Sequence, residues 1–177
     1  IDTSQAAALA AGASVCFPPF DAGGMGRGVG LLDPQGAAFA MWQGAEGDMP
    51  DVKMAPVGKW CWNELWTRDV PGALKFYQTV LGYSVQSMDM GAGGTYHMLA
   101  AHGEDRGGVA ASVNPKARSM WLPYIHVADC DAAAAKAVKL GARLMLGPQD
   151  VPGTGRFAIL VDPMGAAVGV FKPAARA

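Results

Sequence analysis

The chain repeats part of itself. Residues 24–43 (GMGRGVGLLDPQGAAFAMWQ) align without a gap on residues 153–172 (GTGRFAILVDPMGAAVGVFK), at a constant offset of 129. The same offset continues upstream. Identical pairs include Asp2/Asp131, Arg27/Arg156, Asp33/Asp162 and Pro34/Pro163. Sequence repeats of this kind reflect repeated local structure, so residues 1–43 and the last third of the chain should fold alike. Position 1 therefore falls inside a repeating unit.

A second, weaker repeat relates residues 60–70 to residues 120–130. In both copies an alternating run leads to an aspartate, Asp69 or Asp129, which can cap a helix with its side-chain oxygen. Apolar residues at helical spacing follow, and each run ends in Leu-Gly. Short strand-like segments come next, with a DPxG turn before the last one in the final copy. The predicted unit is βαβββ.

Residues 44–59 have neither a helical nor a strand period and are rich in glycine, proline and charge. We therefore predict a partial domain at 1–43, a linker at 44–59 and a complete domain of two βαβββ modules at 60–172. The partial domain lacks a leading strand and a whole module, which indicates a fragment, a processed chain or an incomplete record of one. Its three-stranded sheet would have an uncovered face and edge, so we expect a homodimer or exchange of segment 1–43 between chains.

Composition limits the classes of molecule that this chain is expected to bind. Lys+Arg 14 against Asp+Glu 15 gives a net charge of −1, without a basic block, which argues against nucleic acid and anionic membranes. Apolar runs end well before the roughly 18 residues of a membrane helix. The three cysteines are widely spaced and never form C-x-x-C, which excludes a disulfide framework and a zinc knuckle and favours a reducing cytoplasm.

The paired modules, the stretch ELWTRDVPGALKFYQTVLGY and the DPxGA turn together resemble the vicinal oxygen chelate superfamily, which includes glyoxalase I, extradiol dioxygenases and bleomycin-resistance proteins. The resemblance implies an α+β fold in which paired βαβββ modules form a curved mixed sheet around a cavity, in a tandem-domain protein. The resemblance also implies that the positions of the family's metal ligands fall on Trp62, Leu122 and Gly169, and on Ala40 in the partial domain. None of these side chains can bind a metal. We therefore expect no metal ion of the family type and no cofactor.

Strand alternation groups the candidate site residues. Trp62, Glu64 and Trp66 share one face of their strand, and Leu122, Tyr124 and His126 share one face of theirs. The resemblance implies that both sets face the cavity. Either Tyr96 or His97 should face it too, and the sequence leaves that choice open. Two indoles, a leucine, phenols, an imidazole and a carboxylate are typical of a site for a small, aromatic organic molecule.

Glu64 is the strongest chemical signal, because burying a lone carboxylate costs several kcal/mol. It could be a general base or a ligand-orienting acceptor. Alternatively it could be structural, bonded to Tyr124, His126 or Arg68. His126 could likewise be a catalyst or a hydrogen-bonded wall residue.

Three further patterns are weaker. Arg27 and Arg156 follow Gly-x-Gly at the same repeat position, where we expect them to hold loop carbonyls rather than an anion. The segment GGMGRGVG does not fit a dinucleotide fingerprint, since a strand rather than a helix follows it. Cys61 has no identified base beside it, so we do not expect a catalytic thiol.

Three functions remain. The favoured one is a metal-independent small-molecule-binding protein with an aromatic cavity. The second is an enzyme, either a glyoxalase-type lyase or isomerase or a dioxygenase. In the lyase or isomerase, Glu64 removes a proton while tyrosine, histidine or a metal stabilises the oxyanion. The third is an assembly unit with a vestigial pocket. Whether the chain is an enzyme is open at this stage.

Overall fold

A computed structural model describes residues 1–47, 50–114 and 116–175. These residues form three α-helices, two 3-10 turns and eleven strands in an α+β fold with a mixed sheet, which confirms the predicted class. The elements in chain order are α1 (Asp2–Ala10), β1 (Ser14–Asp21), η1 (Gly23–Met25), β2 (Gly26–Leu32), β3 (Ala38–Gly44), β4 (Trp60–Thr67), α2 (Val70–Leu81), β5 (Ser84–Asp89), η2 (Gly91–Gly93), β6 (Thr95–Ala101), β7 (Glu104–Ala111), β8 (Met120–His126), α3 (Cys130–Lys139), β9 (Arg143–Val151), β10 (Gly155–Val161) and β11 (Ala167–Pro173). None of the described helices is long and apolar enough to cross a membrane.

The long repeat is structural. β2 and β3 have the same bounds as β10 and β11 when the offset of 129 is added. The DPxG turns between them are also alike. Asp33 Oδ1 accepts from the backbone N–H groups two and four residues on, at 2.9 and 2.8 Å, and Asp162 Oδ1 does the same at 2.9 and 2.8 Å. The turn glycines Gly36 and Gly165 have φ of 89° and 94°, which glycine adopts without strain.

The predicted caps of the later helices are present. Asp69 Oδ1 accepts from the Gly72 N–H at 3.0 Å, and Asp129 Oδ1 accepts from the Ala132 N–H at 2.9 Å. Each bond satisfies one of the N–H groups that a helix start leaves without an intrahelical acceptor. α2 ends at Gly82 in the left-handed conformation, with φ of 68°. The helix bounds therefore follow from local sequence signals.

Contacts divide the chain into two compact units: unit 1 comprises Ile1–Asp51 and Glu64–Trp121, and unit 2 comprises Val52–Asn63 and Leu122–Ala177. This grouping follows contacts rather than the order of the chain. The division into 1–43, 44–59 and 60–172 stays a prediction. Residues 48, 49 and 115, which fall within the last two of those segments, lie outside the described residues.

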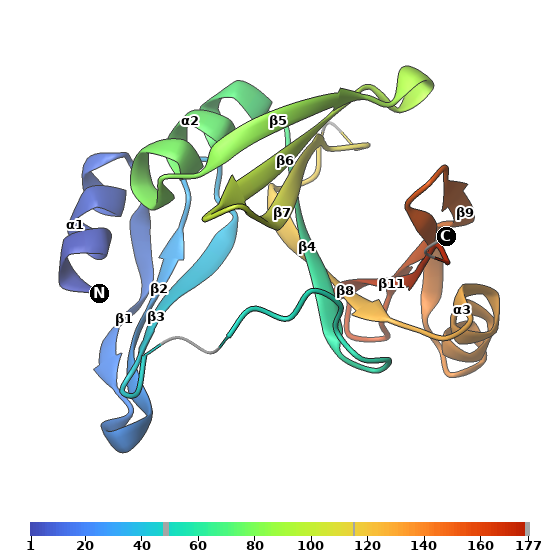
Figure 1. Cartoon of the computed structure of the whole chain (residues 1–177), viewed down its shortest axis with the longest axis horizontal. Helices are drawn as coiled ribbons and strands as arrows, with labels where there is room; N and C mark the ends of the chain where they lie inside the picture. The colour runs from blue at the N-terminus through green and yellow to red at the C-terminus, as the bar shows by residue number, and fades with distance from the viewer. Residues whose placement is uncertain (48–49, 115, 176–177) are drawn as a thin grey trace. The chain divides into compact units, whose positions relative to one another are not determined.

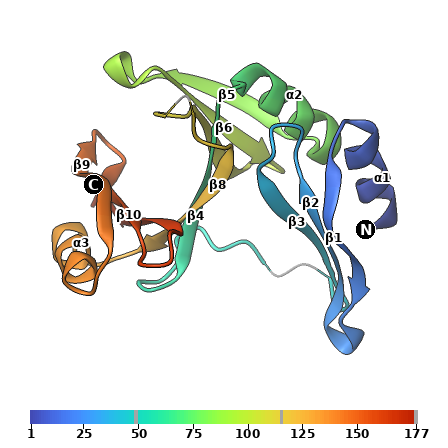
Figure 2. The same ribbon diagram turned by 180° about the vertical axis from the view of Figure 1, so that it is seen from behind.

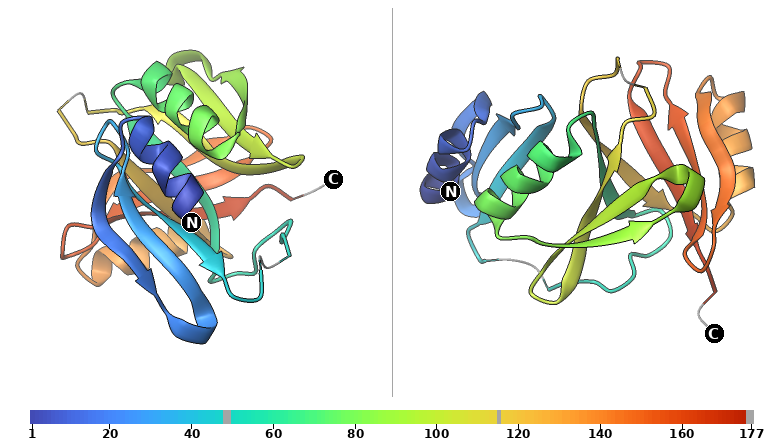
Figure 3. Two further views of the ribbon diagram at one scale, coloured as in Figure 1. Left: turned by 90° about the vertical axis from the view of Figure 1, so that its left-hand side faces the viewer. Right: turned by 90° about the horizontal axis from the view of Figure 1, so that it is seen from above.

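Unit 1 contains two sets of strands. β1, β2 and β3 form an antiparallel sheet, and β5, β6, β7 and β4 lie in that order in a mixed set, with β4 parallel to β7. Helices α1 and α2 pack together, and Figure 3 shows them side by side. The buried core joins segment 1–43 to α2 and its strands. It contains Val29, Leu31, Leu65, Phe76 and Tyr77. The partial repeat is thus part of a packed unit.

A buried hydrogen-bond network crosses this core. Tyr77 donates its hydroxyl to Asp33 Oδ2 at 3.0 Å, and Trp121 Nε1 donates to the Tyr77 hydroxyl at 2.8 Å. Asp33 is 3% exposed and Tyr77 is 1% exposed. Burial, together with the neighbouring carboxylate, raises the pKa of Tyr77 well above its ordinary value. The phenol stays protonated and bridges two buried groups.

Unit 2 is a smaller αβ layer. β8, β11, β10 and β9 lie in that order, with β8 parallel to β11, and α3 packs on β9, β10 and β11 (Figures 1 and 2). The small side chains of Cys130 and Ala134 let α3 approach Ala158, Leu160 and Val170. The unit therefore has an apolar core of its own.

From the sequence we expected Arg27 and Arg156 to hold loop carbonyls. The structure shows that they bind carboxylates instead. Arg27 donates to the Asp2 carboxylate at 3.1 and 3.2 Å, and Arg156 donates to the Asp131 carboxylate at 2.7 and 2.9 Å. The two pairs occupy equivalent repeat positions, each joining a strand to the start of a helix. Aspartate is the better partner because two parallel charge-assisted bonds match the guanidinium fork. The predicted recurrence was right and the predicted partner was wrong.

Candidate functional site

Strand register defines one face of unit 1, opposite to α2. Gly108 on β7 pairs with Glu64 on β4 and with Met98 on β6. Side chains of directly paired residues point to the same side, so these three positions share a face with Trp66 and Tyr96. We call this group the Glu64 face. It comprises Glu64, Trp66, Tyr96, Met98 and Gly108.

This register places Tyr96 and His97 on opposite faces of β6. Tyr96 is on the same face as Glu64. His97 is on the other, where its Nδ1 lies 2.9 Å from the Ser87 hydroxyl. The side of the sheet that His97 shares also holds Leu65, Leu99 and Val109, which are 0% exposed and pack with α2. The face with His97 therefore forms part of the core under α2, whereas the face with Tyr96 carries the candidate site residue Glu64.

Glu64 and Trp66 meet directly on this face. The indole Nε1 of Trp66 donates a hydrogen bond to Glu64 Oε1. Trp66 is 6% exposed, while Glu64 is half-buried. Arg68, one of the structural partners that the sequence allowed, is exposed, and the acceptor role of Glu64 is shown toward Trp66 instead.

The ring of Tyr96 occupies the space above Gly108. A Cβ atom on Gly108 would lie 1.8 Å from the Tyr96 hydroxyl oxygen and 2.3 Å from Cζ. No side chain fits at position 108 while the phenol stays there. The hydroxyl of Tyr96 consequently lies beside the strand position that is paired with Glu64. Tyr96 and Glu64 are both half-buried.

Unit 2 also contains a glycine whose side-chain space is occupied by a tyrosine ring. Gly169 on β11 pairs with Tyr124 on β8, and a Cβ atom on Gly169 would lie 2.1 Å from Tyr124 Cδ1. The ring of Tyr124 packs edge-on to Phe157, with centroids 6.4 Å apart. Tyr124 is 5% exposed and Leu122 is 0% exposed. In both units, a glycine on the last strand of a module is therefore covered by a tyrosine ring.

The side chain and the main chain of His126 both form hydrogen bonds with main-chain groups. Its Nδ1 lies 2.6 Å from the Ala55 carbonyl oxygen, so this nitrogen carries the proton and donates it. The backbone of His126 also bonds to Gly58 and Lys59, at 2.8 and 2.9 Å. These bonds hold the segment before β4 against β8. The arrangement matches the hydrogen-bonded wall residue that the sequence offered as one alternative for His126.

Cys61 does not have the surroundings of a nucleophile. Its thiol donates to the Tyr124 carbonyl at 3.4 Å, and burial raises its pKa. A thiol whose pKa is raised is less often in the reactive thiolate form. This agrees with the prediction from the sequence.

The residues do not fit a metal ion of the family type. Of the implied ligand positions, Trp62 and Leu122 carry no suitable donor, and the side-chain space of Gly169 holds the ring of Tyr124. Within residues 1–47, 50–114 and 116–175, no three or more His, Cys, Asp or Glu side chains come together as a metal site. Tyr96 blocks the corresponding position, Gly108, in the first module.

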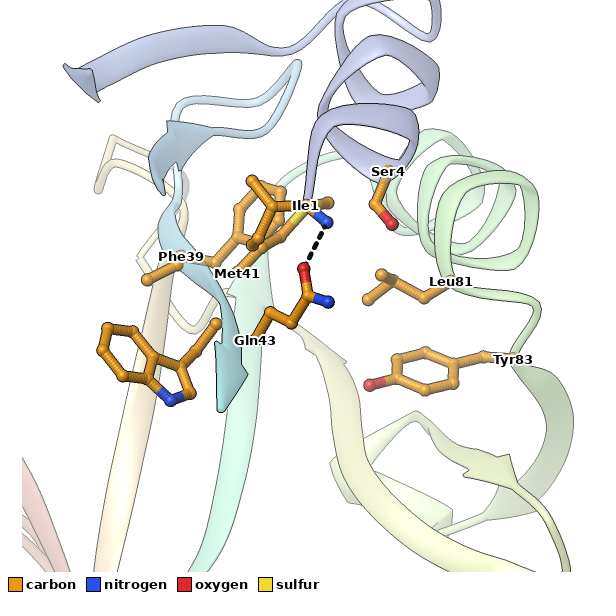
Figure 4. Close-up of a pocket in the computed structure, with 9 residues that line it drawn as sticks. Ile1, Ser4, Phe39, Met41, Gln43, Leu81 and Tyr83 are labelled. Atoms are coloured by element: carbon orange, nitrogen blue, oxygen red, sulfur yellow. Dashed lines mark hydrogen bonds between the residues drawn. The ribbon is translucent and has the colours of Figure 1, made fainter. Parts of the chain in front are cut away.

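Sequence reasoning missed a pocket in unit 1. It has a volume of about 520 Å³ and lies among α1, β3 and the end of α2 (Figure 4). The amino group of Ile1 donates to Gln43 Oε1 at 3.2 Å on one side, and Tyr83 lines the other. Burial raises the pKa of the Tyr83 hydroxyl. The lining includes no carboxylate, imidazole or thiol, and no motif in the sequence could have pointed to it.

A second surface of unit 1 is apolar and open. Phe17, Phe20 and Trp42 lie on one side of the three-stranded sheet and are 55%, 40% and 51% exposed. The ring of Phe20 contacts both others, at centroid distances of 5.3 and 6.1 Å. Gly28 makes the arrangement possible, since a Cβ there would lie 2.8 Å from Phe20 and 3.0 Å from Trp42. We call Phe17, Phe20 and Trp42 the aromatic surface.

Comparisons with known proteins found one matching family model and several similar proteins. A family model described as the glyoxalase/bleomycin resistance protein/dioxygenase superfamily matches residues 60–170. "Putative glyoxylase CFP32" from Mycobacterium bovis is 40% identical over 163 residues, which are 92% of this chain and 62% of that protein. "Anthracycline biosynthesis protein DnrV" from Streptomyces peucetius is 36% identical over 168 residues, 92% of this chain and 58% of that protein. The chain thus spans about three fifths of the length of these relatives.

Solved structures share the fold. The Mn(II)-bound glyoxalase from Novosphingobium aromaticivorans superposes with a TM-score of 0.62 at 23% identity, over 97% of this chain and 58% of that one. A homoprotocatechuate 2,3-dioxygenase variant from B. fuscum gives a TM-score of 0.64 at 15% identity, over 97% and 51%. At such identities the likeness concerns the fold alone.

Proposed function

We propose that this chain, which belongs to the glyoxalase/bleomycin resistance protein/dioxygenase superfamily, binds a small aromatic organic molecule without a metal ion. The observation that carries the proposal is the pair of glycines covered by tyrosine rings, Gly108 by Tyr96 and Gly169 by Tyr124. At these positions the chain presents a phenol in place of a metal-ligating carboxylate. Recognition then comes from ring contacts and hydrogen bonds.

In unit 1 the recognition surface is the Glu64 face. In unit 2 we propose a surface of the same kind, formed by Trp62, Tyr124 and His126. Leu122, which the sequence also offered as a ligand contact, is 0% exposed and can only support this surface. Aromatic contacts contribute about 0.5–1.5 kcal/mol each beyond burial, and a hydrogen bond contributes about 1 kcal/mol. Several such contacts suffice for micromolar affinity. The relative named for anthracycline biosynthesis supports an aromatic small molecule as the ligand.

An enzymatic role is the second candidate, favoured by the relative named a glyoxylase. Glu64 would then be a general base that removes a proton beside a carbonyl, and Tyr96 would be a donor to the resulting oxyanion. Tyr124 and His126 would be the corresponding catalytic candidates in unit 2. A dioxygenase is less well supported, because the described residues do not fit the metal that such chemistry uses.

A thermal-shift screen of aromatic compounds, followed by calorimetry, tests the proposed function. We expect an anthracycline or a simpler fused-ring compound to raise Tm, and Glu64→Gln to weaken binding at least fivefold. Glu46→Gln is the matched control, because Glu46 is exposed in the turn after β3. Stoichiometric Ni, Zn, Mn or Fe in the purified protein would contradict the proposal. Turnover of a carbonyl substrate that is lost in Glu64→Gln would favour the enzyme instead.

We also propose that a second copy of this chain covers the aromatic surface. β3 has no strand on its outer edge among the described strands, and no residue of β3 (AFAMWQG) is charged or a proline. Such an edge is open to pairing. Light scattering should show a dimer that Trp42→Ser dissociates, whereas Trp60→Ser, at a side chain 61% exposed on β4, leaves it intact. A monomer at all concentrations would refute this.

A cytoplasmic location is the last part of the proposal. Cys16, Cys61 and Cys130 are free thiols. Free thiols suit a reducing compartment. Cell fractionation with an antibody against the protein tests this directly, and recovery in a secreted fraction would contradict it.

A further inference from the structure

The pocket among α1, β3 and the end of α2 lies along the edge of β3. Five consecutive residues of that strand, 39–43, line it. Successive side chains of a strand point to opposite faces, so a space on one face of a sheet meets only every second residue. A pocket that touches all five must open onto the edge, where β3 has no neighbour among the described strands. A molecule in this pocket therefore meets main-chain groups of β3 as well as side chains.

The pairing of β2 with β3 shows which main-chain groups face this edge. At the start of the pairing, the Asp33 N–H donates to the Ala37 carbonyl at 2.9 Å. Hydrogen-bonded and non-hydrogen-bonded residue pairs alternate along an antiparallel pair, and the register of β2 on β3 has no break. The even-numbered residues of β3, which include Ala40 and Trp42, therefore turn their N–H and C=O groups away from β2. These groups face the open edge.

The internal repeat shows what an edge of this kind can hold. β11 has the repeat position of β3, and the edge of β11 that faces away from β10 is paired with β8, which runs parallel to it. Phe171, at the repeat position of Trp42, accepts a hydrogen bond from the Val127 N–H at 2.8 Å. The second copy of the repeat therefore has its edge occupied by a parallel extended segment.

The side chains around the pocket are uncharged. Leu81 and Tyr83 line it across from β3, and Figure 4 shows Gln43 directed toward them. No carboxylate, imidazole or basic side chain lines the pocket, and burial raises the pKa of Tyr83, so its phenol stays neutral. A charged side chain placed there would lose water without gaining a counterion. The pocket volume of about 520 Å³ lies within the range of ligand sites.

We propose that this pocket binds a separate peptide segment in extended conformation, which adds to the edge of β3 as a parallel strand. One peptide residue donates its N–H to the Ala40 carbonyl and accepts from the Trp42 N–H. Its side chain is apolar and points toward Leu81 and Tyr83. The preceding peptide residue is small, because Ala40 has a Cβ atom where Gly169 of β11 leaves room for a tyrosine ring. This site is distinct from the aromatic-ligand site proposed above and does not depend on it.

Three peptides test the site by calorimetry on the full chain. The first, acetyl-LPAIHV-amide, is the sequence of residues 122–127 with alanine in place of tyrosine. We expect it to bind about fivefold more tightly than acetyl-LPYIHV-amide, whose tyrosine meets the Cβ atom of Ala40. It should bind about tenfold more tightly than acetyl-LPADHV-amide, in which aspartate replaces the isoleucine that faces Leu81 and Tyr83. Binding of none of the three, or equal affinity for the isoleucine and aspartate peptides, would overturn the inference.

Two N-methylated forms of acetyl-LPAIHV-amide separate strand pairing from apolar contact alone. A methyl group on the isoleucine nitrogen removes the N–H that donates to the Ala40 carbonyl, so affinity should fall about tenfold. A methyl group on the histidine nitrogen removes an N–H that points away from β3, so affinity should stay the same. The two peptides form a matched pair that requires no change in the protein. Equal affinities for both would overturn the pairing with β3.

A protein variant tests the same edge from the other side. Ala40→Pro removes a main-chain N–H that faces the peptide, so it should weaken acetyl-LPAIHV-amide about tenfold. The sheet should tolerate this proline, because the Ala40 N–H does not pair with β2. Near-ultraviolet circular dichroism would confirm that the variant is folded. Undiminished binding to folded Ala40→Pro would count against the proposed hydrogen bonds.

The peptide and the second copy of the chain proposed above would share the edge of β3, so they should compete. If light scattering shows a dimer, excess acetyl-LPAIHV-amide should convert it to a monomer. If the chain is a monomer and binds the peptide, this inference stands and the proposed dimer fails. A dimer that persists in excess peptide, with no heat of binding, would show that a second copy occupies the edge instead. Aromatic ligands bind elsewhere in the proposed function, so their affinity is unaffected by any of these results.

Discussion

Replacing Tyr77 with phenylalanine should destabilise unit 1 by removing one oxygen atom from its core. The hydroxyl donates to Asp33 Oδ2 and accepts from Trp121 Nε1, at 3.0 and 2.8 Å. Tyr77→Phe keeps the ring, so no cavity of ring size forms, but two buried polar groups lose this partner. An unsatisfied buried group costs about 1–3 kcal/mol, and more when it is charged. We expect the free energy of unfolding to fall by about 3 kcal/mol.

Urea unfolding followed by tryptophan fluorescence measures this loss. The m-value should stay the same, because the surface exposed on unfolding hardly changes. Tm should fall by roughly 6–12 °C, at about 2–4 °C per kcal/mol for a chain of this size. Tyr83→Phe is the control, since this hydroxyl lies in the pocket of Figure 4 rather than in the network. A loss below about 0.5 kcal/mol for Tyr77→Phe would refute the reasoning.

The pH dependence of the stability difference between the wild type and Tyr77→Phe provides an independent check. The pKa of Tyr77 is raised in the folded chain above the ordinary value of 10.0. A group with a raised folded pKa contributes stability that is fully present below the unfolded pKa and is lost as pH rises toward the folded value. The wild-type advantage over Tyr77→Phe should therefore be constant below about pH 9 and shrink above pH 10. An advantage that grows with alkaline pH would show that the sign is wrong.

Further predictions concern the repeats and caps. Gly169→Ala should lower stability by about 1–3 kcal/mol in urea unfolding, because the new Cβ overlaps the ring of Tyr124. Asp129→Ala should cost about 1 kcal/mol by removing the cap of α3. Arg156→Gln should lower stability at pH 6, and the difference should vanish as pH falls below 3.8, because the guanidinium holds the pKa of Asp131 below that ordinary value. A difference that persists in full at pH 2 would contradict this assignment.

Local patterns explain why much of the fold could be predicted. The constant offset of the repeat assigns β2 and β10 the same bounds, and the caps at Asp69 and Asp129 mark the starts of α2 and α3. The bounds and the caps depend on residues that are close in the sequence within each copy of the repeat. Strand alternation likewise placed Glu64 and Trp66 on one face, because the side-chain period of a strand is two.

The features that were missed depend on contacts between distant residues. The bond from Tyr77 to Asp33 spans 44 positions, and no local pattern indicates it. The choice of Tyr96 over His97 required the register of β6 on β7, which alternation within one strand cannot supply. The ring of Tyr96 over Gly108 needed that register and a side-chain rotamer as well.

Metal independence is the central claim about function, and calorimetry with and without a chelator tests it most directly. The full chain would be titrated with 2-naphthol after dialysis against EDTA, and again after adding Mn²⁺, Ni²⁺ or Zn²⁺. We predict the same affinity in every titration, because the proposed recognition uses ring contacts and hydrogen bonds rather than a metal ion. Binding that disappears on chelation and returns with one metal would contradict the account.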